Sequence, residues 1–265
     1  MPKEGIIVDR RDILKVAAGG VAAALTGTSS QVYAQSTTAA AVAPEKLRID
    51  VHGHYYPVEY LDMLDEYGGG GTGTAIARKA PLPGGGGSPE ELEARFEMMD
   101  NTGVEMMLLS AAPQLPYFEN EEHGITAARY INDAYADMVE QHPDRFAAYA
   151  VTPLPHVDAS LEEMTRALDT LGMVGVTMGT SVMCKSVTDP AFDPFWEEMN
   201  RRGSILFFHP EGVGACSAMV NAYNLTWPIG ATIEDTMLTA HLIAQGIPSR
   251  YPNVRIIVPH LGGEI

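Results

Sequence analysis

Two histidines lie one residue apart at the end of a short apolar run in IDVHGHYYP, residues 49–57. In a β-strand, residues i and i+2 project from the same face, so His52 and His54 would aim both imidazoles at one point. Neutral imidazoles held side by side are good ligands for a transition metal. The pair is equally compatible with two histidines that meet by accident in a core or on a surface, so the other histidines must be considered.

Two further histidines, like His52 and His54, lie at the ends of apolar runs that read as strands. His209 follows the apolar run of ILFFHP (205–210), and His260 ends VRIIVPH (254–260). The carboxyl ends of parallel strands share one face of an α/β sheet or barrel, and that face holds the active site. We therefore expect these four histidines to meet there. The remaining four fall in predicted helices or loops and are interpreted as structural or solvated: His123, His142, His156 and His241.

Strand-like runs alternate with helical ones from residue 47 onward. The predicted strands are 47–53, 104–110, 145–152, 173–179, 205–210 and 254–260. The predicted helices are 88–103, 122–143, 158–172, 189–203 and 231–246. This alternation predicts an α/β fold with a parallel sheet built from βαβ units. Six strands could complete a doubly wound open sheet, whereas an eight-stranded (β/α)₈ barrel would still lack its last two units.

A glycine-rich stretch, residues 68–87, interrupts the alternation. It matches G-x-G-x-x-G by count, but no strand precedes the match and no helix opens at it, so a dinucleotide site is not predicted. No G-K-[ST] follows, which excludes a P-loop. The stretch predicts a flexible loop, with a mobile lid over the nearby histidines as the sharper alternative. Arg78 and Lys79 lie within it.

The charge of the chain is strongly acidic. Its 265 residues carry a net charge of −17, with six of the 17 Lys/Arg and four of the 34 Asp/Glu in residues 1–48. The remainder therefore carries 11 basic and 30 acidic residues, a net charge of −19. Such a body repels phosphate backbones and anionic lipid heads, so nucleic acid and membrane surfaces are not expected partners. An anionic substrate would need a local positive centre, which a metal could supply.

The N-terminal segment has the pattern of an export signal. DRRDILK (9–15) precedes the small, apolar VAAGGVAAAL (16–25), and a V-x-A cleavage signal ends at Ala34. This pattern predicts a signal peptide over 1–34, a small-residue linker over 35–46 and one domain over 47–265. Arg10 and Arg11 resemble a twin-arginine signal, which implies a periplasmic protein without stable membrane association after cleavage. An uncleaved membrane anchor is the alternative.

Only two cysteines occur, Cys184 and Cys216, and neither has a C-x-x-C partner. This spacing excludes a cysteine-based zinc site and a thioredoxin-like motif. Two buried free thiols are expected, with a single disulfide as the alternative.

Three histidine motifs in this order resemble amidohydrolase family 2: HGHYYP, FFHPEG and PHLGG. The similarity continues through PDRFAAYAVTPLP (143–155) and runs from about residue 47 to the C-terminus. It implies a distorted TIM barrel that binds a divalent metal, commonly zinc. By this resemblance His52, His54 and His209 match metal ligands, and His260 matches the catalytic base or acid.

The resemblance also implies the chemistry. It favours a metal-dependent decarboxylase of a small aromatic or unsaturated carboxylic acid, with a hydrolase of a lactone or amide bond as the alternative. Three imidazoles leave a zinc ion with an open position, where it can activate water or polarise a substrate oxygen. His260 could then take up or return a proton. The expected partner is a small carboxylated molecule, and a homo-oligomer stays open.

The sequence departs from the family pattern at its end. Family members carry a metal-binding Asp after the last strand, whereas this sequence stops at Glu264 and Ile265. We therefore expect residues 1–265 to be part of a longer chain, and an inactive metal-binding fragment is a third interpretation. Further candidates for substrate contact are Glu211, Arg78 and Tyr55.

Overall fold

The computed structural model describes residues 47–68, 73–78 and 88–265. The predicted signal peptide (1–34) and linker (35–46) lie outside the described residues, as does Lys79. Among the described residues, no helix is both long and apolar enough to cross a membrane.

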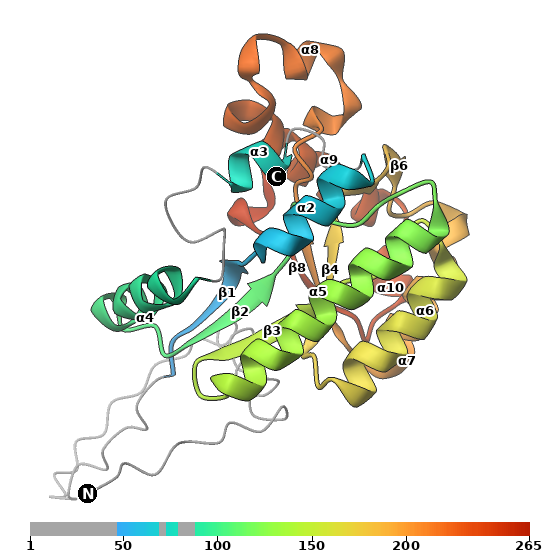
Figure 1. Ribbon diagram of the computed structural model, residues 1–265. Helices are drawn as coiled ribbons and strands as arrows, with labels where there is room; N and C mark the ends of the chain where they lie inside the picture. The colour runs from blue at the N-terminus through green and yellow to red at the C-terminus, as the bar shows by residue number, and fades with distance from the viewer. Residues whose placement is uncertain (1–46, 69–72, 79–87) are drawn as a thin grey trace, which may run out of the picture.

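Six parallel strands form one sheet in the order β1-β2-β3-β4-β7-β8 (Figure 1). Their bounds are β1 Ile49–His54, β2 Met106–Ser110, β3 Phe146–Ala150, β4 Gly175–Gly179, β7 Ile205–His209 and β8 Arg255–Ile257. Each strand pairs with the one before it along the chain, apart from the short β5 and β6, which form a separate hairpin. A doubly wound sheet would reverse its strand order at a switch point. The sequential order is instead that of a TIM barrel, and the expected six-stranded part of such a barrel is confirmed.

Helices cover the outer face of the sheet, where α5, α6 and α7 lie in a row (Figure 1). The long helices are α2 Val58–Glu66, α4 Pro89–Thr102, α5 Glu121–Gln141, α6 Val157–Thr165, α7 Asp193–Arg202 and α9 Ala231–Ala244. The hydroxyl of Ser88 caps α4 by accepting a hydrogen bond from the backbone N–H of Glu91. Left-handed glycines, Gly103 and Gly203, end α4 and α7. All five predicted helices are confirmed, whereas α2 was not predicted.

The alternation of strand side chains divides the core into two layers. Outward-facing residues pack under the helices around fully buried aromatic side chains such as Trp196 and Tyr135. Inward-facing residues fill the concave side: Met106, Leu108, Ala147, Tyr149, Val174, Ile205 and Phe207. Phe207 stacks on Tyr149 with ring centroids 5.0 Å apart, and it also contacts the rings of His52 and His209, at 5.4 and 6.3 Å. The inner core thus ends directly at the predicted histidine cluster.

Short elements fill the connections at the carboxyl ends of the strands. They are α3 Gly73–Ala77, β5 Ser181–Val182, β6 Lys185–Ser186, η2 Pro190–Phe192, η3 Gly214–Cys216, α8 Ala218–Asn221, η4 Ala222–Asn224, η5 Thr226–Gly230 and η6 His260–Gly262. A π-helical turn, η1 Arg166–Thr170, extends α6, and α10 Ile247–Arg250 connects α9 to the amino end of β8. The expectation of a structureless loop over 68–87 is wrong for α3. This short helix is held to α2 because the Thr74 hydroxyl donates to Asp65 at 2.7 Å.

A disulfide joins Cys184 to Cys216, so the expectation of two free thiols is wrong. The β5–β6 hairpin carries Cys184 towards the connection after β7, and η3 carries Cys216. The two residues are 32 positions apart in the chain, a spacing that does not indicate pairing by itself. The pairing depends on the hairpin, whose two-residue strands give no periodic pattern in the sequence.

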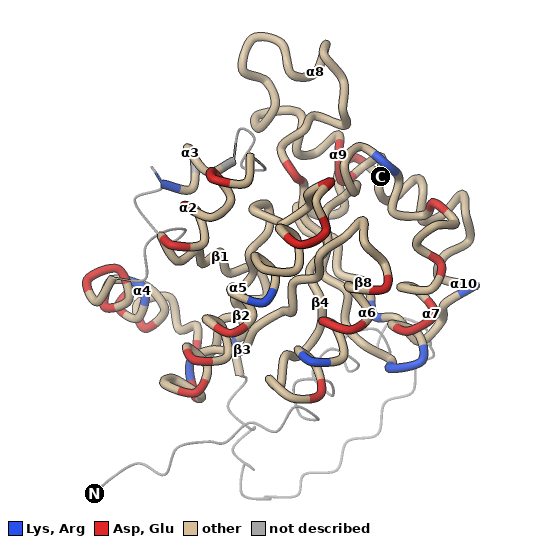
Figure 2. Tube along the Cα trace, turned by 45° about the vertical axis from the view of Figure 1, so that its right-hand side comes forward, with Lys and Arg blue, Asp and Glu red and all other residues tan. Residues whose placement is uncertain are grey.

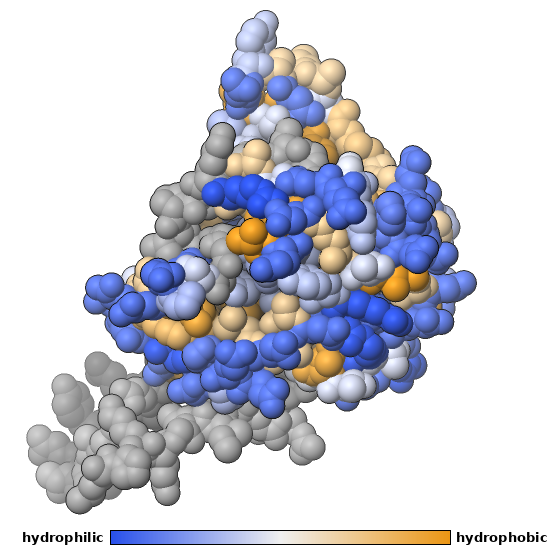
Figure 3. Space-filling view, in the orientation of Figure 1, coloured by the Kyte–Doolittle hydropathy of each residue, from blue (hydrophilic) through white to orange (hydrophobic). Residues whose placement is uncertain are grey.

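The surface has the acidic character that the composition predicts. Figure 2 shows Asp and Glu over the outer helices, most densely on α4. The hydrophilic residues cover much of the face seen in Figure 3. The segment 212–233, which includes α8, carries no charged residue.

Candidate metal centre

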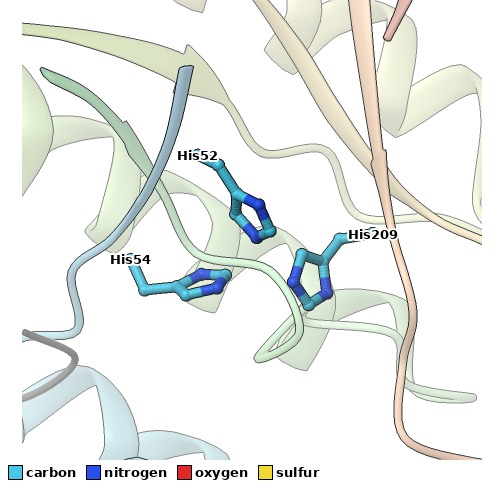
Figure 4. Close-up of side chains that lie close together, drawn as sticks. All are labelled: His52, His54 and His209. Atoms are coloured by element: carbon cyan, nitrogen blue, oxygen red, sulfur yellow. The ribbon is translucent and has the colours of Figure 1, made fainter. Parts of the chain in front are cut away.

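Three histidine side chains from two strands converge on one point (Figure 4). His52 and His54 project from β1, and His209 projects from the last position of β7. One ring nitrogen of each lies within 4.8 Å of the others. Gly53 lies between the two β1 histidines, and a Cβ at this position would overlap the Met107 side chain of β2. The local sequence H-G-H therefore places two imidazoles on one face of β1, while Gly53 leaves room for the Met107 side chain of β2.

Burial keeps these imidazoles neutral. It lowers the pKa of His54 to about 3, with a smaller contribution from the nearby His52. Burial also lowers the pKa of His209 well below its usual value, and the pKa of His52 falls for the same reason. A neutral imidazole has one nitrogen with a free lone pair, which is the form that binds a metal.

The hydrogen bonds around the rings also fit a metal ion. His209 Nδ1 lies 2.7 Å from the carbonyl oxygen of Pro210, so Nδ1 carries the proton and Nε2 is left as the ligand atom. Nε2 of His52 and Nδ1 of His54 are buried and have no hydrogen-bond partner in the part of the chain that the structure describes. Buried polar nitrogens without a partner are costly, and a cation between the rings would satisfy them.

His260 lies beside this triad, at the start of η6 after β8. Its ring centroid is 5.1 Å from that of His52 and 5.4 Å from that of His209. Its Nδ1 lies 2.8 Å from Oδ2 of Asp235, and its side chain keeps 35% exposure. The structure thus brings together all four histidines that the sequence predicts, and His260 is the one that remains open to a substrate.

The three other predicted contact residues lie in different surroundings. Glu211 accepts hydrogen bonds from the backbone N–H and the hydroxyl of Ser181, both at 2.9 Å. Burial raises the pKa of the Glu211 carboxyl to about 8. Its place two residues after His209 keeps it a candidate.

Tyr55 and Arg78 are occupied by other side chains. The Tyr55 ring packs against Tyr135 of α5, and the Arg95 guanidinium of α4 lies 5.4 Å from its centroid. Arg78 pairs with Asp62 and Asp65 of α2 at 2.7 and 2.9 Å. Their proposed contact with substrate stays a prediction.

Two adjacent carboxylates on α9 were missed by the sequence analysis. Glu234 accepts hydrogen bonds from the backbone N–H groups of Glu211, Val213 and Gly214 at 2.6–2.9 Å, and from the Thr180 hydroxyl at 2.9 Å. It therefore holds the chain that follows His209. Asp235 contacts His260. The available signal was an acidic pair inside the otherwise uncharged run GATIEDTML (230–238).

The histidines interpreted as structural are indeed bonded or packed outside the cluster. His241 Nδ1 lies 3.0 Å from the Ser186 hydroxyl, and His156 Nε2 lies 2.9 Å from the Phe118 carbonyl. His123 stacks on Tyr67 with centroids 4.1 Å apart. His142 ends α5.

Comparison with known proteins identifies similar chains. The amidohydrolase family model matches residues 49–264. A 2-amino-3-carboxymuconate-6-semialdehyde decarboxylase of Dictyostelium discoideum is 28% identical over 230 residues, which is 82% of this chain and 64% of that protein. The decarboxylase yanB of Aspergillus niger is 33% identical over 231 residues, which is 82% of this chain and 59% of that protein. This chain thus spans less than two thirds of the length of these relatives.

Solved structures show the same fold. A 2,6-dihydroxybenzoate decarboxylase from Rhizobium superposes with a TM-score of 0.65 at 24% identity, over 83% of this chain and 68% of that one. A 5-carboxyvanillate decarboxylase from Novosphingobium aromaticivorans, in complex with manganese, superposes with a TM-score of 0.66 at 23% identity, over 82% of this chain and 66% of that one.

Proposed function

Because the chain belongs to the amidohydrolase family, we propose that it is a metal-dependent decarboxylase of a small aromatic or unsaturated carboxylic acid. The observation that carries this proposal is the triad of neutral histidines with His260 beside it. Relatives at about 30% identity are named as decarboxylases of such acids, among them a gamma-resorcylate decarboxylase and a 6-methylsalicylic acid decarboxylase.

His52, His54 and His209 would hold a divalent ion. Bound there, the ion would supply a positive centre that draws electrons from the oxygens of the substrate. Zinc is our first choice because three neutral imidazoles suit it. Manganese is the rival, since the 5-carboxyvanillate decarboxylase structure contains it.

The remaining chemistry falls to side chains of the chain itself. The substrate carboxylate would lie at the open face of the triad, beside the partly exposed His260. The C–C bond to the carboxylate then breaks, CO₂ leaves, and the electron pair stays on the ring or chain carbon. That carbon takes the proton from Nε2 of a His260 ring that carries a proton on both nitrogens, because Nδ1–H is held by Asp235. Nε2 then takes up its next proton from solvent. Phe207 packs against the His52 ring, with centroids 5.4 Å apart, and is itself fully buried in the inner core.

A substrate screen with the purified, metal-loaded full chain tests this proposal. Hydroxybenzoates and carboxymuconates should release CO₂, and His260→Asn should reduce the rate by at least about 100-fold. His123→Ala, which removes a histidine outside the cluster, serves as the matched control and should leave the rate unchanged. Cleavage of lactones or amides without CO₂ release would replace the proposal with the hydrolase alternative. A metal-loaded chain that does neither would be a binding fragment.

We also propose that the protein is exported through a twin-arginine signal. The Cys184–Cys216 disulfide supports this proposal, because disulfides persist mainly in oxidising compartments. Cell fractionation should find the mature protein in the periplasm, shortened by 34 residues. Replacement of Arg10 and Arg11 by Lys should leave the precursor in the cytoplasm, and a precursor that is still exported would overturn the assignment.

A further inference from the structure

Asp235 is a buried carboxylate with an unusual set of contacts. Its side chain is fully buried on α9, and its Oδ2 lies 2.8 Å from Nδ1 of His260. Its other oxygen, Oδ1, is also buried and has no hydrogen-bond partner among the described residues. A carboxylate placed only for stability would be expected to have more partners, since a buried charge with an unmet acceptor is destabilising.

The preceding residue, Glu234, is a buried carboxylate whose contacts are those of a stabilising group. Glu234 is equally buried, yet four donors surround it: the Thr180 hydroxyl and the backbone N–H groups of Glu211, Val213 and Gly214. Its role in holding the 211–214 loop is therefore clear from its contacts. The Asp235 side chain has one hydrogen-bond partner among the described residues, the His260 ring, so its burial is explained by that ring.

The turn that carries His260 is docked on α9 by several independent contacts. The backbone N–H of Glu264 donates to the Thr236 hydroxyl at 2.9 Å, and the Thr239 hydroxyl lies 3.3 Å from the Gly262 carbonyl. Gly263 approaches Thr236 so closely that a Cβ would overlap its hydroxyl. His260 itself has a φ of 50°, a left-handed conformation that is unfavourable for a residue with a side chain. The chain accepts this strain where it brings the ring to Asp235.

We propose that Asp235 is the positioning residue for His260. By accepting the Nδ1–H hydrogen bond, Asp235 fixes the rotation of the ring and keeps the proton on Nδ1. Only Nε2 then gains and loses a proton during the reaction. A carboxylate that orients a histidine in this way sets its tautomer without being protonated itself. The catalytic part of this inference rests on the proposed decarboxylase function, whereas the control of the tautomer does not.

Nuclear magnetic resonance of ¹⁵N-histidine in the full chain tests the tautomer directly. The His260 signals are assigned by their loss in His260→Gln. In its neutral form, the wild-type ring should show Nδ1 protonated and Nε2 unprotonated. Asp235→Asn, which keeps the shape of the side chain, and Asp235→Ala should both shift His260 towards the Nε2-protonated form. An unchanged His260 tautomer in a folded Asp235 variant would overturn the proposal, whatever the activity.

Steady-state kinetics separate positioning from a purely structural role. Asp235→Asn should lower kcat by at least about tenfold while KM and metal content stay near the wild-type values. A loss of metal instead would make Asp235 part of the metal centre and overturn the positioning role. If wild type shows no decarboxylation but the tautomer shifts as expected, the proposed function fails and the role of Asp235 stands. Equal kcat in wild type and Asp235→Asn would show that the position of the His260 ring does not affect the reaction rate, and would overturn the catalytic part of the inference.

Discussion

The carboxylate of Glu211 lies directly over Gly179, the last residue of β4, where a Cβ would overlap its Oε1 atom. Ser181, two residues further along, holds the same oxygen through its backbone N–H and its hydroxyl. Residue 179 must therefore be glycine for Glu211, in the segment that follows His209, to take its observed position. Gly179 and His209 are register partners, so the last residues of β4 and β7 lie side by side in the sheet.

Gly179→Ala should destabilise the protein by about 1–3 kcal/mol, because the added methyl must displace a packed carboxylate. The displacement also moves the segment next to His209, so metal affinity should fall. Urea unfolding and metal titration measure the two effects. Glu211→Ala removes the obstacle, and in that background Gly179→Ala should have a much smaller effect. Strict additivity of the two substitutions would show that the contact is not the cause.

The metal-free protein should be most stable between about pH 4.5 and 6.5, where the opposite effects of His54 and Glu211 cancel, and should lose stability on both sides of this range. Burial lowers the pKa of His54 to about 3, so between pH 3 and 6.5 the unfolded chain binds a proton that the folded chain does not. Stability from this group is present above pH 6.5 and is lost as the pH falls. Burial raises the pKa of Glu211 from 4.5 to about 8, so its contribution is present below pH 4.5 and is lost as the pH rises to 8.

Glu211→Gln isolates the second effect. The glutamine cannot ionise in either state, so wild type should become less stable relative to this variant as the pH rises from 4.5 to about 8. Denaturant unfolding at several pH values, in the presence of a chelator, measures the difference. A difference that does not change with pH would mean that the Glu211 carboxyl titrates normally in the folded protein.

The histidine cluster could be predicted because it depends on a simple geometric rule. His52 and His54 share a face through the two-residue period of a strand, and His209 lies at the end of another strand of the same parallel sheet. These relationships follow from strand positions alone, and strongly apolar runs mark the strands clearly. β1 and β7 are not neighbours in the strand order. Their carboxyl ends approach one another because the sheet curves as part of a barrel, and strand positions in the sequence do not give this curvature.

The contacts around the cluster could not be predicted in the same way. Asp235 lies on a helix 25 residues before His260, and their contact depends on how one turn docks on α9. The Cys184–Cys216 disulfide depends on a hairpin of two-residue strands, too short to give a periodic signal. Local periodicity determines elements, whereas these contacts depend on connections between elements, which carry no periodic pattern.

Reduction of the disulfide should weaken the folded state. It links the β5–β6 hairpin to the connection after β7 and closes a loop between residues 32 positions apart, for which about 2–4 kcal/mol of stabilisation is typical. Thermal unfolding with and without a reductant should show a lower Tm for the reduced protein. The double variant Cys184→Ser with Cys216→Ser should unfold like the reduced protein and should not respond to reductant. An oxidised wild type that also does not respond would contradict the presence of the bond.

The metal centre itself is tested by elemental analysis of the purified full chain. Wild type should hold about one divalent ion per chain, because three neutral imidazoles converge with unsatisfied buried nitrogens. His52→Ala together with His54→Ala should abolish binding, since a single imidazole cannot retain the ion against dilution or a chelator. His209→Ala, which leaves two ligands, should weaken binding by at least about tenfold.

His123→Ala provides the matched control for these substitutions, because His123 stacks on Tyr67 and lies outside the one histidine cluster found among the described residues. Its metal content should equal that of wild type. Full metal content in the His52 and His54 double variant would show that the ion is bound elsewhere. Because an ion that binds only the folded state stabilises it, metal loading should also raise the Tm of wild type but not that of the double variant. That second measurement separates a specific site at the strand ends from adventitious binding to the acidic surface.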